Sequence, residues 1–227
     1  MLIAGIQKVT LLDYPGHIAC EIFTRGCNFK CPFCQNSSLI PLNGDENYSE
    51  EELFHYLKRR KNVLDGVVIT GGEPLIHKDI PLFIEKIKQL GLLVKLDTNG
   101  SNPEMLEFLL THQLVDYVAM DIKNVFSKYF ITAGKKVNLE NIKRSIEIIK
   151  RSSVAHEFRT TIIKEMHQLE DIRNICELIG DDVYYLQNFE DSRDVINHEL
   201  HGFSYEELLF IYGELKKQFP KIEIRTL

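Results

Sequence analysis

The sequence of 227 residues contains no tryptophan, only seven prolines and only five cysteines. No apolar run approaches the roughly 20 residues that a membrane-spanning helix needs, and no basic-then-apolar signal segment opens the chain. Positively charged residues are outnumbered, since the chain has 27 lysines and arginines but 33 aspartates and glutamates. A net charge of -6 gives no bulk attraction for nucleic acid. We therefore expect a cytoplasmic protein that binds neither membrane nor nucleic acid.

The chain also lacks internal repeats, low-complexity tracts and linkers rich in proline, glycine or serine. Its hydrophobic fraction of 44% and charged fraction of 26% are ordinary for a globular protein. A chain of this length can bury one sizeable core. We expect a single domain that covers residues 1–227.

Short runs of Val, Ile, Leu, Phe and Tyr alternate with longer segments of helical periodicity. The runs that predict strands are residues 17–23, 66–70, 92–96, 117–122, 157–163, 183–186 and 222–225. Helix starts are indicated by capping boxes at Ser49 and Ser204 and by Asn102 before a proline. The alternation favours an α/β fold with a parallel sheet, either open and doubly wound or an incomplete barrel. In both folds the site lies at the carboxyl ends of the strands.

Three of the five cysteines, Cys27, Cys31 and Cys34, lie in one loop directly after the first predicted strand. Their spacing is C-x3-C-x2-C, and thiolates are soft ligands that suit an iron–sulfur cluster or zinc. A structural zinc site needs four protein ligands, whereas three cysteines on a four-iron cubane leave one iron open. Zinc completed by a distant histidine remains the alternative. We expect Cys20 and Cys176 to be small buried residues.

Three further motifs follow successive predicted strands: residues 70–74 (TGGEP), 97–100 (DTNG) and 121–123 (DIK). Each by itself is compatible with an ordinary turn. A barrel brings the carboxyl ends of its strands to one mouth, so we expect the motifs to meet the cysteine loop there. Asp97 and Asp121 are also candidates for a cation site. Arg159, in the next predicted strand, either faces the site or pairs with Glu157.

The cysteine loop, with Phe33 before its last cysteine, resembles the signature of the radical S-adenosylmethionine (SAM) superfamily. Residues 4–8, 12–16 and 23–28 also look like the activating proteins of anaerobic ribonucleoside-triphosphate reductase, which are glycyl-radical-enzyme activases. The resemblance implies a partial (β/α)6 TIM-like barrel and a [4Fe-4S] cluster on Cys27, Cys31 and Cys34. One departure is Gln35, where related activases often carry histidine.

The resemblance also implies an activity. The reduced cluster would cleave SAM reductively, and the 5′-deoxyadenosyl radical would take a hydrogen atom from a glycine of a partner enzyme, here anaerobic ribonucleotide reductase. Flavodoxin or ferredoxin would supply the electron. The residues implied in cofactor binding are Phe33, Gln35, Gly71, Gly72, Glu73, Pro74, Asp97, Thr98, Asn99, Asp121 and Lys123.

Three points stay open at this stage. Residues 127–137 are a candidate lining for the entrance that the partner glycine uses. Gln187 and Asn188 either reach a ligand or are satisfied polar residues at a strand end. Two other functions compete: a radical SAM enzyme that acts on a small molecule, such as a 7-carboxy-7-deazaguanine synthase, and a zinc-stabilised binding module without catalysis.

Overall fold

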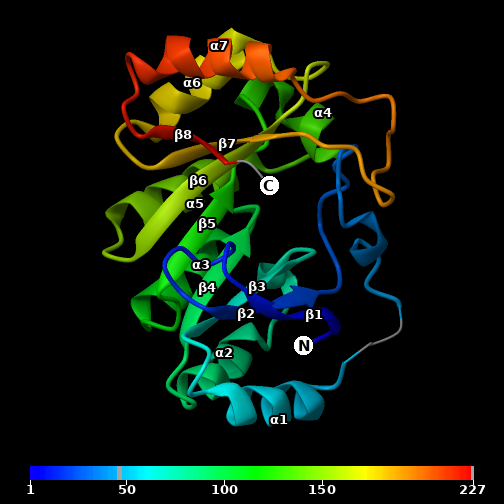
Figure 1. Cartoon of the computed structure of the whole chain (residues 1–227), viewed down its shortest axis with the longest axis vertical. Coiled ribbons are helices and arrows are strands. Elements are labelled where there is room, and N and C mark those ends of the chain that lie inside the picture. The colour runs from blue at the N-terminus through cyan, green and yellow to red at the C-terminus, as the bar shows by residue number, and fades with distance from the viewer. Residues whose placement is uncertain (45–47, 226–227) are drawn as a thin grey trace.

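The structure is a computed structural model that describes residues 1–44 and 48–225. Its centre is one curved eight-stranded sheet, in which the strands follow one another in sequence order (Figure 1). The strands are β1 (Ile3–Thr10), β2 (Ala19–Thr24), β3 (Gly66–Gly71), β4 (Leu93–Thr98), β5 (Tyr117–Asp121), β6 (Ala155–Ile162), β7 (Tyr184–Asn188) and β8 (Ile222–Arg225). β1 pairs antiparallel with β2, and the remaining pairs are parallel.

The helices surround the outside of the curved sheet, from α1 at the bottom of Figure 1 to α7 at the top. They are α1 (Glu50–Arg60), α2 (Ile80–Lys88), α3 (Pro103–Thr111), α4 (Tyr129–Ala133), α5 (Leu139–Arg151), α6 (Leu169–Ile179) and α7 (Tyr205–Lys216), with short 3-10 helices η1 (Ser37–Leu39), η2 (Pro74–Ile76) and η3 (Phe126–Lys128). Within the described residues, no helix combines the length and the apolar character needed to cross a membrane.

The predicted α/β fold with a partial barrel is confirmed. The predicted capping boxes begin α1 and α7, and Asn102 caps α3. The main miss is β1, an antiparallel strand at the edge of the sheet. Its residues Gln7, Lys8 and Val9 are exposed, so β1 lacks the continuous apolar run of a buried parallel strand.

The two faces of the sheet differ in chemistry because side chains alternate along each strand. Residues such as Ile22, Val94 and Leu96 belong to the apolar core beneath the helices. The intervening positions on the concave face carry charge, for example Lys95 and Asp97. Within the described residues, no pairing joins β1 to β8, so the sheet does not close into a full barrel.

Candidate active site

The cysteine loop, residues 27–34, is held from two sides by backbone hydrogen bonds. Lys30 N donates to the carbonyl of Ala133 in α4 at 2.9 Å. Asn197 N, from the segment after β7, donates to the carbonyl of Pro32 at 2.9 Å. Segments far apart in the sequence thus fix the path of the loop that carries the three thiols.

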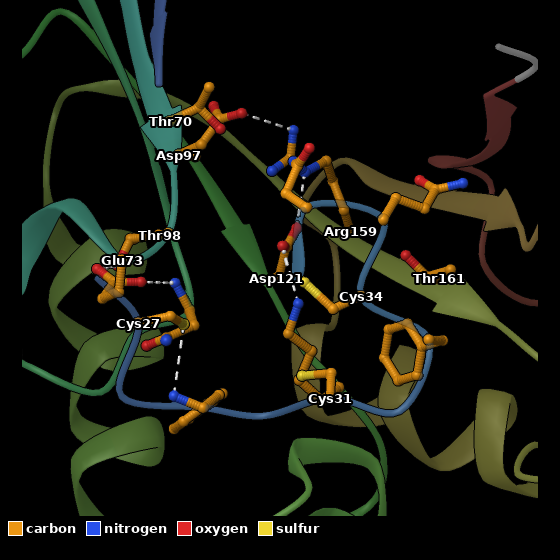
Figure 2. Close-up of a pocket in the computed structure, with 18 of the residues that line it drawn as sticks. Cys27, Cys31, Cys34, Thr70, Glu73, Asp97, Thr98, Asp121, Arg159 and Thr161 are labelled. Carbon is orange, nitrogen blue, oxygen red and sulfur yellow. Dashed lines mark hydrogen bonds and ion pairs between the residues drawn. The ribbon is translucent and has the colours of Figure 1, made fainter. Parts of the chain in front are cut away.

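The three thiols line one pocket at the carboxyl ends of the strands (Figure 2). Cys31 is buried, while Cys27 and Cys34 are half-buried. Burial raises the pKa of Cys27 to about 12 and that of Cys31 to about 11, and the nearby ammonium of Lys123 acts in the opposite direction. Burial also raises the pKa of Cys34, and Lys123 again acts in the opposite direction. The Lys123 ammonium therefore favours the thiolate form of all three cysteines.

The glycines after β3 bring the backbone close to the cysteine loop. A Cβ atom on Gly72 would lie 2.0 Å from the carbonyl oxygen of Gly26, so only glycine fits there. The next amide, Glu73 N, donates to the same carbonyl at 2.8 Å. Gly72 therefore allows the backbone after β3 to approach the cysteine loop closely.

The Glu73 side chain links the ends of β3 and β4. It is 1% exposed and accepts hydrogen bonds from Thr98 Oγ1 and Asn99 N, both at 2.7 Å, and from Leu75 N at 3.1 Å. Burial raises its pKa to about 7, although these hydrogen bonds act to lower it. Glu73 thus orders the two strand ends. The following Pro74 begins η2 and does not line the pocket.

Asn28 ties the cysteine loop to the turn after β4. Its Oδ1 accepts from Asn99 Nδ2 at 2.9 Å, and its Nδ2 donates to Ser101 Oγ at 2.7 Å. The loop and the turn therefore behave as one unit, so a shift of either would move the other.

Five charged side chains form a continuous chain of alternating sign across the pocket wall. Arg159 donates from Nη1 to Asp97 at 3.1 Å and from Nε to Asp121 at 2.9 Å. Lys95 pairs with the other oxygen of Asp97, and Lys123 pairs with the other oxygen of Asp121 at 3.0 Å. Burial alone would raise the pKa of Asp121, but Arg159 and Lys123 hold it well below its usual range. Among the described residues that line the pocket, Lys123 and Arg159 are the cations that can attract an anionic ligand.

Arg159 faces the pocket rather than pairing with Glu157, the other possibility that the sequence left open. Its guanidinium faces the pocket, as Figure 2 shows, while Glu157 pairs with Arg225 at 2.7 Å. The cations that Asp97 and Asp121 meet in this structure are side chains of the protein itself.

Lys123 keeps hydrogen-bonding capacity for a ligand. Its ammonium carries three N–H donors, and within the described residues one of them donates a hydrogen bond, to Asp121. Its Nζ lies 5.9 Å from the centre of the Phe33 ring, at the cysteine end of the pocket. Two donors near the cysteines suit a ligand carboxylate.

Every predicted site residue except Pro74 lines this one pocket. Those that do so are Cys27, Cys31, Phe33, Cys34, Gln35, Gly71, Gly72, Glu73, Asp97, Thr98, Asn99, Asp121 and Lys123. The pocket also includes Gln187 and residues outside the predicted site, among them Asp13, Ile40 and Thr161. Thr161 follows Arg159 with period two in β6, a signal that would have found it. Asn188 instead exchanges two 2.8 Å hydrogen bonds with the Phe203 backbone, so it is a satisfied strand-end residue.

That residues 127–137 line the entrance for the partner glycine stays a prediction. None of them is among the pocket-lining residues that the structure describes. They form α4 and the turn after it, and Ala133 contacts Lys30 of the cysteine loop instead. Cys20 and Cys176 are 0% and 2% exposed, which confirms that they are buried core residues.

The donor set fits a cubane better than a single ion. In residues 1–44 and 48–225, no three Cys, His, Asp or Glu side chains converge as ligands of one metal ion. Tetrahedral zinc requires such convergence, whereas three thiolates of a cubane bind three different irons and stand apart around one cavity. Three thiols on one rigid loop beside a cation satisfy that requirement.

The comparisons with known proteins agree with this geometry. Residues 22–179, more than half of the chain, match the family model of the radical SAM superfamily. The chain belongs to the radical SAM superfamily. As a radical SAM protein it is an enzyme that uses a [4Fe-4S] cluster and SAM.

Two relatives and one solved structure add detail to the radical SAM assignment. A Methanocaldococcus jannaschii protein, provisionally named a glycyl-radical enzyme activating enzyme, is 35% identical over 234 residues, which cover 100% of this chain and 96% of that protein. The 7-carboxy-7-deazaguanine synthase of Hyperthermus butylicus is 42% identical over 87 residues, or 37% of this chain and 36% of that enzyme. Streptococcus suis SuiB bound to S-adenosylmethionine shares the fold, with a TM-score of 0.70, 16% identity, and coverage of 90% of this chain and 48% of SuiB.

Proposed function

We propose that this radical SAM enzyme activates a glycyl-radical enzyme, and that its partner is anaerobic ribonucleoside-triphosphate reductase. The observation that carries the proposal is the similarity along the whole chain to a relative provisionally named as such an activase. The similarity to a 7-carboxy-7-deazaguanine synthase is higher in identity but covers little more than a third of the chain. The N-terminal runs 4–8 and 12–16 favour the reductase activases within the group.

In this proposal Cys27, Cys31 and Cys34 bind the cluster. When bound, the cluster and SAM supply one-electron chemistry that removes a hydrogen atom from a C–H bond of the substrate. The protein contributes position, charge and a pocket shielded from water. Burial of Cys31 and the packing of Phe33 beside it supply that shielding.

The carboxylate of SAM is proposed to meet Lys123. Asp121 orients the ammonium, and Arg159 holds Asp121, so the two free donors of Lys123 keep one direction. The backbone carbonyls of Gly71 and Gly72 are proposed to accept from the amino group of SAM. Phe33, Gln35, Thr98 and Asn99 complete the wall around the ligand.

The open sheet supports a macromolecular substrate. β1 and β8 do not pair in the described part of the chain, so no backbone hydrogen bonds close the sheet between these two edges. The pocket extends from the cysteine loop to Asp13 in the β1–β2 connection. A glycine on a loop of another protein can therefore approach between the two edges of the sheet.

The test is anaerobic incubation of the cluster-loaded enzyme with SAM, a strong reductant and purified candidate partners. We expect a glycyl-radical doublet in the electron paramagnetic resonance spectrum with anaerobic ribonucleotide reductase and none with pyruvate formate-lyase. A doublet only with the lyase would overturn the partner. Conversion of the small-molecule substrate of a 7-carboxy-7-deazaguanine synthase, without any doublet, would overturn the activase function.

A further inference from the structure

α4 and the turn after it lie against the outer side of the cysteine loop, as Figure 1 shows beside the blue segment. Besides the hydrogen bond from Lys30 N to Ala133, the contact includes Gly134, whose φ is +69°. A Cβ atom at Gly134 would lie 1.8 Å from the carbonyl oxygen of Lys30. The surface of α4 is therefore continuous with the loop that carries Cys27 and Cys31.

This part of the molecule carries exposed apolar residues and exposed lysines close together in the chain or across the contact with the cysteine loop. Phe130 and Ile131 are 58% and 49% exposed, although Tyr129 and Ala133 of the same short helix are fully buried. Lys30, Lys135 and Lys136 are exposed, and none of them forms an ion pair within residues 1–44 and 48–225. An apolar centre with a charged rim is the usual anatomy of a protein interface. We call the exposed residues Phe130, Ile131, Lys30, Lys135 and Lys136 the α4 patch.

The charge of the α4 patch is opposite to that of the protein. Its three lysines stand on a chain of net charge -6. A local positive field of this kind steers an acidic partner to one place, while the rest of the surface repels it.

The enzyme needs such a partner because the electron for the cluster must come from outside. The chain has only five cysteines, and the two outside the pocket are isolated in the core, so it carries no second cluster to relay electrons. The patch contributes no residue to the pocket. A donor on the α4 patch therefore leaves the mouth free for SAM and the substrate.

We propose that the α4 patch is the docking site of a small acidic electron-transfer protein of the flavodoxin or ferredoxin class. The donor loses one electron and the cluster gains it. The inference rests on the cluster assignment and is independent of which protein receives the radical.

The test compares two triple charge reversals of equal net charge in cluster-loaded enzyme. One carries Lys30→Glu, Lys135→Glu and Lys136→Glu. The control carries Lys58→Glu, Arg59→Glu and Lys61→Glu at the end of α1, across the molecule from α4 in Figure 1. Stopped-flow absorbance follows cluster reduction by reduced acidic flavodoxin at low salt, with photoreduced deazaflavin as a small reductant that needs no docking.

We expect the patch reversal to slow reduction by flavodoxin at least about tenfold and to flatten its salt dependence. The α1 reversal should change the rate much less, and deazaflavin should reduce all three proteins equally. Phe130→Ser with Ile131→Ser should weaken flavodoxin binding while the salt dependence stays that of the wild type.

A wild-type rate in the patch reversal would overturn the docking site, as would an equal fall in the α1 reversal. A matching loss with deazaflavin would also overturn it, because the lysines would then act on the cluster itself. The readout needs no glycyl-radical partner, so failure here is distinct from failure of the activase proposal.

Discussion

At the scale of single residues, the five cysteines divide into two classes. Three line the pocket, while Cys20 and Cys176 pack in the core. We expect Cys31→Ala to lose bound iron, the visible absorbance of the cluster and all reductive cleavage of SAM. Cys176→Ala should keep all three, since α6 contributes no residue to the pocket. Iron analysis and a SAM-cleavage assay on both variants check this, and iron-loaded, active Cys31→Ala would contradict the site.

Two arginines that each bridge two carboxylates offer a comparison of burial. Arg159 joins Asp97 to Asp121 in the pocket wall, whereas the exposed Arg144 of α5 joins two exposed glutamates of α3. Removing one partner of a buried ion network typically costs about 3–5 kcal/mol. We expect Arg159→Met to lower the free energy of unfolding by that amount and to weaken SAM binding through Lys123.

Arg144→Met is the matched control, and its effect on unfolding should be far smaller because water screens exposed pairs. Urea unfolding and equilibrium dialysis with SAM measure the two quantities. Equal losses of stability in both variants would show that the buried ion pairs of Arg159 contribute no more to the free energy of unfolding than the exposed pairs of Arg144.

At the scale of elements, the contact between α4 and the cysteine loop can be tested through two glycines with positive φ. Gly91 has φ +80° and open space around its Cβ position, while Gly134 faces the Lys30 carbonyl. Gly91→Ala should cost only the left-handed strain of about 1–2 kcal/mol. Gly134→Ala must also displace the loop, so we expect reduced iron retention as well as reduced stability.

Iron per chain after anaerobic desalting distinguishes the two glycine variants. Full iron retention in Gly134→Ala would mean that the cysteine loop does not depend on α4.

The elements differ in how well the sequence predicts them. α5 and α6 can be read from the sequence because their isoleucines recur with helical spacing. α4 could not be predicted, since five residues with exposed Phe130 and Ile131 carry no periodic signal. The motif residues Asp97 and Thr98 lie inside β4 rather than after it. Their polar side chains face the pocket, so polarity in the sequence ended the predicted strand too early.

The sequence predicted where the pocket lies but not which of its charged side chains pair with one another. Motifs at the ends of successive strands pointed to one mouth, since parallel strands end on the same side. The partners of Arg159 depend on the register of β4, β5 and β6, which pairs Asp121 with Arg159 across two strands. The register between strands that are distant in sequence cannot be read from local sequence patterns. The sequence therefore could not decide whether Arg159 faces the pocket or pairs with Glu157.

At the scale of the whole molecule, the concave face of the open sheet carries charged residues, whereas the interior of a closed (β/α)8 barrel is mostly aliphatic. Glu21 of β2 lies on this face and is 7% exposed. Burial raises its pKa to about 7, and Asp13 and Asp97 push it in the same direction against Lys95 and Arg159. The protein therefore carries a carboxyl group that resists ionisation when folded.

This carboxyl makes global stability depend on pH. Between pH 4.5, the ordinary value, and about 7, the folded state holds more protons on Glu21 than the unfolded state does. The free energy of unfolding therefore falls as pH rises through that window, by at most about 3 kcal/mol, and this contribution is constant above it. We expect Glu21→Gln to be more stable than the wild type at pH 8, with the difference shrinking towards pH 5. Anaerobic urea unfolding at pH 5, 6, 7 and 8 measures it, and a difference independent of pH would show that Glu21 ionises freely in the folded protein.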